Sequence, residues 1–338
     1  MSADTSAPSA GPARAAGDGS VIHDLGYRRY DGPRLGRAQI VRALAWHSFR
    51  AAFGLGRGAK AKIVPLVALV ALCLPAVVNA FAMSRGNAQL VYYDIYTPAL
   101  RDIVMTIFVA VQAPELMSRD LRSRVLPLYF ARPIKTIDYP LAKYLAFTGA
   151  CLVMLEVPLL LLYGGSIANV HGGAAVWGQT KGLIPGLLVG LMWAVVVAAI
   201  SLFLASLTGR RAFATGAVAI FFLLTFTLAE ILLQVEGPPQ GVQGTQQVQQ
   251  IKGSGGSGQQ IIVHVLVPAA TFAQKISGLF SPFTLFDGVR MWLGGSSHPA
   301  DNVPDPGAFG VVYALVLVVI TALCLYGLAA RYRKARLS

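Results

Sequence analysis

An arginine-rich segment between two strongly apolar stretches carries the most informative chemistry of this sequence. It begins at Glu115, continues through a run of Arg, Asp and Ser, and reaches Lys143. Arginine and carboxylate side chains form strong, charge-assisted hydrogen bonds with groups of opposite charge on another molecule. A short amphipathic piece with this composition therefore predicts a surface at which a soluble partner docks.

Sequence motifs of enzyme centres are missing. The chain contains no Gly-x4-Gly-Lys-Ser/Thr phosphate loop, no His-Glu-x-x-His pair and no Gly-x-Ser-x-Gly turn. The five histidines are scattered over loops and termini, and the three cysteines lie in three different apolar stretches. We therefore expect no catalytic residue, no metal site and no ATP site belonging to this chain.

Composition places the chain among membrane proteins. Of its 338 residues, 55% are hydrophobic and only 13% are charged, whereas soluble domains contain about 25% charged residues. A helix needs roughly 20 apolar residues to cross a bilayer. We expect an all-α polytopic membrane protein with six transmembrane helices, at residues 63–83, 98–116, 140–163, 183–207, 213–235 and 309–330. Because Arg101 and Asp102 stand near the start of the second stretch, a re-entrant or interfacial helix is the alternative there.

The net charge of +13 follows the loops between the predicted spans. Lys and Arg are concentrated in the cytoplasmic loops of membrane proteins. With six spans, most of the 28 Lys and Arg residues fall on one side, and only the following fall on the other: Arg85, Arg101, Lys181, Lys252, Lys275 and Arg290. The distribution of charge therefore predicts that both termini lie in the cytoplasm, and it does not indicate nucleic-acid binding. We expect a multi-pass protein of the plasma membrane.

The chain divides into four predicted regions. A disordered cytoplasmic tail occupies residues 1–20, and a cytoplasmic segment with an amphipathic connecting helix occupies residues 21–62. The six-helix transmembrane domain covers residues 63–330, including a charged segment at 115–139 and an outer loop at 236–308. A basic cytoplasmic tail follows at residues 331–338.

The amphipathic helix is predicted at about residues 35–53. One face collects mostly apolar residues at helical spacing, namely Ile40, Val41, Leu44, Ala45, Ser48 and Ala52. Arg42, Trp46 and Arg50 lie on the opposite face. Basic residues together with tryptophan are typical of a helix lying along the lipid headgroups. An ordinary solvated helix is the alternative.

The outer loop begins with Gly/Gln/Pro/Ser-rich low complexity at residues 237–260. Two apolar pieces follow, at residues 261–267 and 272–292, and Pro and Gly residues interrupt them. Because neither reads as a full crossing, we expect re-entrant or interfacial helices on the outer side, packed against protein. A small folded exterior cap is the alternative.

Residues 115–143 resemble the region after the second helix of ABC-2-type permeases, the membrane subunits of type V ABC exporters. The matching positions are Glu115, Ser123, Leu126, Arg132, Pro133 and Lys143. The six predicted spans, the amphipathic helix before the first span and the irregular outer segment before the last are also similar. The departures are Ser123, where the family usually has Gly, and an outer loop longer than is typical.

The resemblance implies that this segment forms a coupling helix seated in a groove of a nucleotide-binding subunit. Arg119, Asp120, Arg122 and Arg124 would then supply charged contacts, and Leu121, Val125 and Leu128 would supply the apolar anchor. ATP and Mg would be bound by that ATPase subunit, and a second permease, the same or similar, would complete the membrane part. The alternative is that these arginines pair with phosphates of membrane lipid.

Glu156 lies inside the predicted third span, where an ionisable side chain is costly. It is the candidate for a substrate pathway, although it could instead pair with another helix or stay protonated. Because the spans contain few polar groups, the expected cargo is apolar or amphipathic. The alternatives to an ATP-driven exporter are an ion-coupled secondary carrier that uses Glu156 as its proton site, and a receptor-like or assembly module presenting the outer loop.

Overall fold

The computed structural model describes residue 32 and residues 36–86, 89–93, 96–123, 129, 134–235, 241–243, 266–268, 271–293 and 307–335. The chain separates into two units, Met1–Leu35 and Gly36–Ser338, and everything below concerns the second. The predicted tail at residues 1–20 and most of the low-complexity segment at 237–260 lie outside the described residues.

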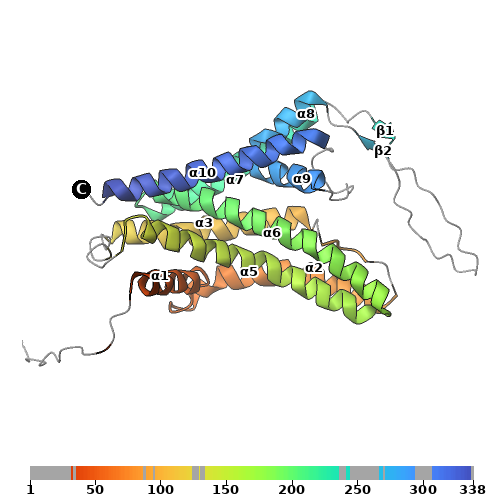
Figure 1. The fold of residues 1–338 in the computed structure, drawn as a ribbon, viewed down its shortest axis with the longest axis horizontal. Helices are drawn as coiled ribbons and strands as arrows, with labels where there is room; N and C mark the ends of the chain where they lie inside the picture. The colour runs from red at the N-terminus through yellow and green to blue at the C-terminus, as the bar shows by residue number, and fades with distance from the viewer. Residues whose placement is uncertain are drawn as a thin grey trace, which may run out of the picture. The chain divides into compact units, whose positions relative to one another are not determined.

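Seven long helices make up most of the described chain (Figure 1). They are α1 (Arg37–Ala52), α2 (Lys60–Ser84), α3 (Pro98–Arg122), α5 (Asp138–Asn169), α6 (Gly173–Ser206), α7 (Arg211–Val235) and α10 (Gly310–Ala335). Shorter elements precede α10, namely α8 (Phe272–Ser277), η1 (Gly278–Phe280), α9 (Pro282–Trp292) and η2 (Gly307–Phe309). The strands β1 (Gly241–Gln243) and β2 (Leu266–Pro268) form one short antiparallel pair.

Five helices are long and apolar enough to span a membrane, namely Lys60–Ser84, Asp138–Asn169, Gly173–Ser206, Arg211–Leu233 and Gly307–Arg333. They coincide with five of the six predicted spans. The remaining stretch, 98–116, belongs to α3, which is helical but carries charges at both ends: Arg101, Asp102, Glu115, Arg119, Asp120 and Arg122. A helical architecture typical of membrane proteins is therefore confirmed, with five helices that meet the criteria for a crossing.

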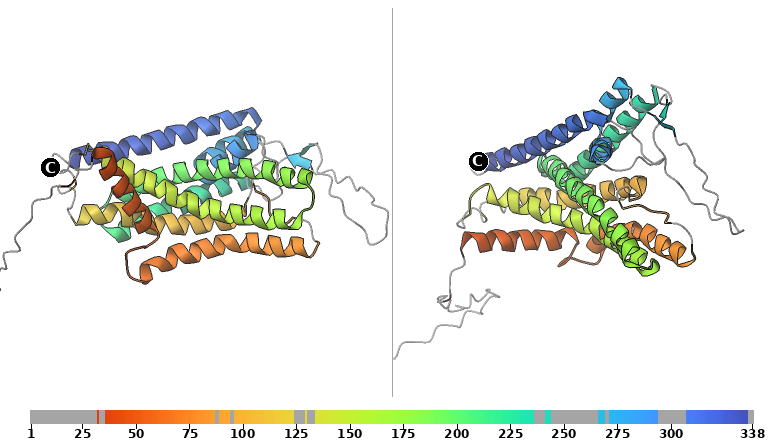
Figure 2. Two further views of the ribbon diagram at one scale, coloured as in Figure 1. Left: turned by 60° about the horizontal axis from the view of Figure 1, so that its bottom comes forward. Right: turned by 45° about the vertical axis from the view of Figure 1, so that its right-hand side comes forward.

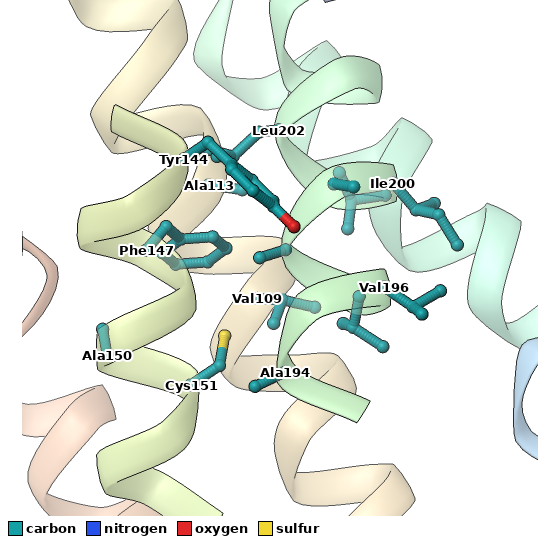
Figure 3. Close-up of a cluster of buried hydrophobic side chains, with 14 of the residues drawn as sticks. Val109, Ala113, Tyr144, Phe147, Ala150, Cys151, Ala194, Val196, Ile200 and Leu202 are labelled. Carbon is teal, nitrogen blue, oxygen red and sulfur yellow. The ribbon is translucent and has the colours of Figure 1, made fainter. Parts of the chain in front are cut away.

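Helix α3 lies in the middle of the bundle and packs against α2, α6 and α7, with smaller contacts to α1 and α5. Figure 3 shows part of this core, where Val109 and Ala113 of α3 face Phe147 of α5 and Ala194 of α6. The small side chains of Ala113 and Ala194 let the helices approach closely, which increases their van der Waals contact. The core thus holds α3 tightly against its neighbours over the middle of its length.

Helix α1 lies across α5, as the left-hand view of Figure 2 shows. Its buried residues are Leu44, Ser48 and Ala52, whereas Arg42, Trp46 and Arg50 are exposed. Arg37 at its start donates to both carboxylate oxygens of Asp138 at the start of α5, over 2.6 and 2.5 Å. This hydrogen bond raises the pKa of the Arg37 guanidinium. An ion pair thus fixes the start of α1 to α5.

The segment before α10 folds into the bundle. Helix α9 has 11 residues, which span about 16 Å, roughly half of a bilayer core about 30 Å thick. Every residue of α9 from Pro282 to Met291 is buried, against α6, α7 and α10. A side chain at Gly288 would place its Cβ 2.1 Å from the ring of Tyr313, so only glycine allows α9 and α10 to pack this closely.

Candidate functional site

The predicted coupling segment begins inside α3, because this helix continues past Glu115 and ends at Arg122. Arg119, Asp120 and Arg122 therefore lie on the last turns of one continuous helix. The structure describes the backbone of Leu121 but not its side chain. Six other predicted residues lie outside the described residues, namely Arg124, Val125, Leu126, Leu128, Arg132 and Pro133.

Glu115 is the centre of the first charged cluster, which we call the Glu115 cluster. Its Oε1 accepts from Nη1 of Arg57 at 2.9 Å and lies 3.6 Å from Nη1 of Arg119, and its Oε2 lies 3.0 Å from Nη1 of Arg211. The pair with Arg119 joins two residues of α3 that lie one helical turn apart. The other two pairs join α3 to the connection before α2 and to the start of α7.

Arg57 is the most enclosed of these arginines, with 19% of its side chain exposed. Burial lowers the pKa of its guanidinium, the charge of Glu115 opposes this shift, and the nearby positive charges of Arg119 and Arg211 add to it. A guanidinium remains protonated at neutral pH in proteins. The Arg57 guanidinium therefore stays charged beside Glu115 despite its burial.

Asp120, the neighbouring acid, is directed into the protein. Its Oδ2 lies 2.9 Å from Nζ of Lys143 on α5, and it accepts a 2.7 Å hydrogen bond from the hydroxyl of Tyr139. Only 6% of the Lys143 side chain is exposed, and a buried ammonium needs a counter-ion. Asp120 was predicted to contact a partner, but the structure gives it internal partners that bind α3 to α5.

Aromatic rings enclose this second ion pair. The ring of Tyr139 is fully buried and packs against Tyr129 and Tyr332, with centroid distances of 5.4 and 5.1 Å. Tyr332 lies on α10, so the last helix also packs at this point. A cavity of about 530 Å³ lies between the two ion-pair groups, lined among others by Arg57, Glu115 and Lys143.

The end of α3 also presents positive charge to its surroundings. The side chain of Arg119 is 62% exposed and that of Arg211 is 60% exposed, and Arg122 is exposed as well. These guanidinium groups can donate to carboxylates or phosphates outside the chain. The end of α3 therefore combines inward acids that fix neighbouring helices with outward arginines that can bind an anionic group.

A second charged group, which we call the Arg101 cluster, lies at the start of α3. Nε of Arg101 donates to Oδ1 of Asp102 at 2.9 Å, and its Nη2 lies 3.9 Å from Oδ1 of Asp287 on α9. All three side chains are less than 10% exposed. Because buried charges require such compensation, this cluster ties the short helix α9 to α3.

Glu156 of α5, the predicted pathway residue, lies beside the Arg101 cluster. It lines a cavity of about 30 Å³ together with Tyr93, Tyr96, Arg101 and Trp193. Its carboxylate packs on α6, where a Cβ at Gly190 would lie 2.4 Å from Oε1. In the described part of the chain, Oε2 of Glu156 is buried without a hydrogen-bond partner. Sequence reasoning identified Glu156 and Arg101 separately but did not predict that they share one cavity.

Nothing in the geometry of the described residues indicates a metal centre, since no group of three or more His, Cys, Asp or Glu side chains converges there. The sequence matches no model of a protein family, and no curated protein matches it. The chemistry of the two charged clusters is therefore the basis on which the function is argued.

Proposed function

We propose that this chain is the transmembrane permease subunit of an ATP-driven ABC exporter, with ATP hydrolysed by a separate subunit. The proposal rests on one observation: at the end of α3, the arginines are exposed while the acids are paired with other helices and connections of the bundle. Arg119 and Arg122 are exposed there, while Glu115 and Asp120 are ion-paired to residues on other parts of the bundle. A partner bound to the arginines would therefore move several helices together.

The proposed topology has six spans: the five apolar helices and, in addition, α3, which is the second span along the chain. Its 25 residues correspond to about 37 Å, enough to cross a bilayer core of about 30 Å. Its buried charges at the start are compensated by one another and by α9, which lowers the cost of placing them within a membrane. Helix α1 would lie along the cytoplasmic headgroups, and α8 to α9 would form the re-entrant segment on the outer side.

In the proposed mechanism, two permeases and two ATPase subunits form the exporter. ATP and Mg are bound by the ATPases, and their closure displaces the end of α3. The Glu115 cluster passes this displacement to α7 and to the connection before α2, and the pair of Asp120 with Lys143 passes it to α5. The cavity between the permeases then opens outward, and an apolar or amphipathic cargo leaves.

The test is purification of the tagged chain from native membranes, followed by identification of co-purified proteins and a vanadate-sensitive ATPase assay. We expect a stoichiometric protein with a phosphate-binding loop, and its loss from the Arg119→Glu/Arg122→Glu variant. Arg333→Glu, an exposed arginine on α10, is the matched control and should retain the partner. A preparation from native membranes in which no ATPase accompanies the chain contradicts the proposal.

One observation favours a second function, an ion-coupled carrier without an ATPase. Glu156 has a buried carboxylate oxygen that lacks a hydrogen-bond partner in the described part of the chain, beside a small polar cavity. A carboxyl group in such a place can take up and release a proton during transport. Transport by proteoliposomes containing this chain alone, driven by a pH gradient and lost in Glu156→Gln, would establish the carrier.

A further inference from the structure

A groove of about 1,090 Å³ lies between the end of α3 and the start of α7. Three arginines line it, namely Arg122 of α3 and the adjacent Arg210 and Arg211 at the start of α7. In the described part of the chain, Arg122 and Arg210 form no ion pair. Arg211 pairs with Glu115 but remains 60% exposed. The groove thus holds three positive charges against a single acid.

The start of helix α7 adds to this positive charge. The first backbone N–H groups of a helix have no partner within the helix and carry the positive end of its dipole. Arg211 is the first residue of α7, so these N–H groups lie at the same end of the helix as Arg210 and Arg211. Both features favour an anion, and phosphate oxygens are well suited to several guanidinium donors at once.

The groove becomes apolar further along both helices. Val111 lines it on α3, eleven residues before Arg122, a separation of about 16 Å along a helix. On α7 the lining continues through Ala212 and Gly216. Space is open beside Gly216, because a Cβ there would meet no atom within 4 Å. The groove therefore combines a basic end with an open, apolar continuation.

We propose that this groove binds an anionic phospholipid, with its phosphate among Arg122, Arg210 and Arg211. One acyl chain lies along Val111, Ala212 and Gly216. Basic pockets between membrane helices on the cytoplasmic side are suited to anionic headgroups, and the apolar continuation fits a lipid better than a soluble anion. The site requires only the helical membrane architecture and does not depend on the proposed transport function.

The geometry also predicts competition inside the site. Arg211 lies 3.0 Å from Oε2 of Glu115, and a bound phosphate draws on the same guanidinium. The negative charge of Glu115 therefore opposes lipid binding. Glu115→Gln should retain the anionic lipid more strongly than the unchanged protein, whereas a nonspecific loss of structure would weaken retention.

The experiment measures lipid binding to the purified full-length chain, without any ATPase, by native mass spectrometry with added phosphatidylglycerol or phosphatidylcholine. We expect tight retention of phosphatidylglycerol only. In Arg122→Gln/Arg210→Gln its apparent affinity should fall about 30-fold. Arg119→Gln is the matched control, because Arg119 is also an exposed arginine near the end of α3 but does not line the groove. This variant should bind phosphatidylglycerol as the unchanged protein does.

A steric variant tests the apolar part while all charges stay in place. Gly216→Leu fills the open space and should weaken binding of phosphatidylglycerol. Gly164→Leu on α5, another helical glycine with no atom within 4 Å of a built Cβ, should leave it unchanged. Gel filtration establishes that each variant remains monodisperse. The proposal is overturned if both lipids are retained equally or if the groove variants bind like their controls.

Discussion

The two ends of α3 carry charged clusters of opposite character. At its start, Arg101, Asp102 and Asp287 are all buried and compensate one another. At its end, Glu115 and Asp120 are largely enclosed, but Arg119 and Arg211 around them are mostly exposed. Figure 1 shows α1 and the end of α10 at one end of the bundle and α8 at the other.

This difference separates a structural cluster from an interaction surface. A buried cluster whose charges compensate one another is enclosed by the protein, and its loss must appear in the stability of the fold. Exposed arginines contribute little to stability, because solvent and salt screen their charges. Their value lies in what they can bind. Substitutions in the buried cluster should therefore lower stability, whereas substitutions of the exposed arginines should change binding with little effect on stability.

The largest effect is expected at the start of α3. Asp102→Leu leaves the Arg101 guanidinium buried with only the more distant Asp287 and should lower the free energy of unfolding by about 3–5 kcal/mol. Unfolding in mixed micelles, titrated with SDS, measures this loss. The double variant Arg101→Met/Asp102→Leu removes both charges and should recover much of it. A single variant as stable as the unchanged protein would falsify the assignment of this cluster to the fold.

A smaller effect is expected for the inner ion pair at the other end. Asp120→Asn removes the counter-ion of the buried Lys143 but keeps an acceptor for Tyr139, so the loss should be about 2–3 kcal/mol. The same unfolding titration measures it. Lys143→Met combined with Asp120→Leu should cost less than Lys143→Met alone. If Asp120→Asn left the free energy of unfolding unchanged, the pair of Asp120 with Lys143 would not be the firm connection from α3 to α5 that the proposed mechanism requires.

The smallest effect on stability is expected at the exposed rim. Arg119→Ala removes a pair whose arginine is 62% exposed and should change the free energy of unfolding by less than about 1 kcal/mol. The accompanying change in ATPase capture, measured on the same preparation, should be much larger. A loss of stability comparable to that of Asp102→Leu would remove the contrast between the two ends.

Local features of the fold and of the site could be predicted from the sequence. Five of the six predicted spans coincide with helices apolar enough to cross a membrane, because hydropathy depends on neighbouring residues alone. The pair of Glu115 with Arg119 was predictable as well, since it needs only helical spacing. The stretch around Arg101 and Asp102 was the weakest of the predicted spans, because its charges lower the hydropathy whether or not other residues compensate them.

Contacts between distant segments could not be predicted in this way. Glu115 meets Arg57 and Arg211, which belong to other parts of the chain, and no spacing rule connects them. Lys143 was identified from its place in a motif, but its role as counter-ion to Asp120 depends on how α3 packs against α5. The environment of a charge, and thus its effect on stability or binding, depends on which helices surround it.

The sequence by itself determined the class of this protein, the position of its apolar helices and the place where charge interrupts them. These properties follow from local composition and from the thickness of a bilayer. Only the tertiary structure decided that the charges at the start of α3 are buried with α9, whereas arginines at its end remain exposed. Exposure depends on packing between helices that are distant in sequence, and the energy of a charge depends on that exposure.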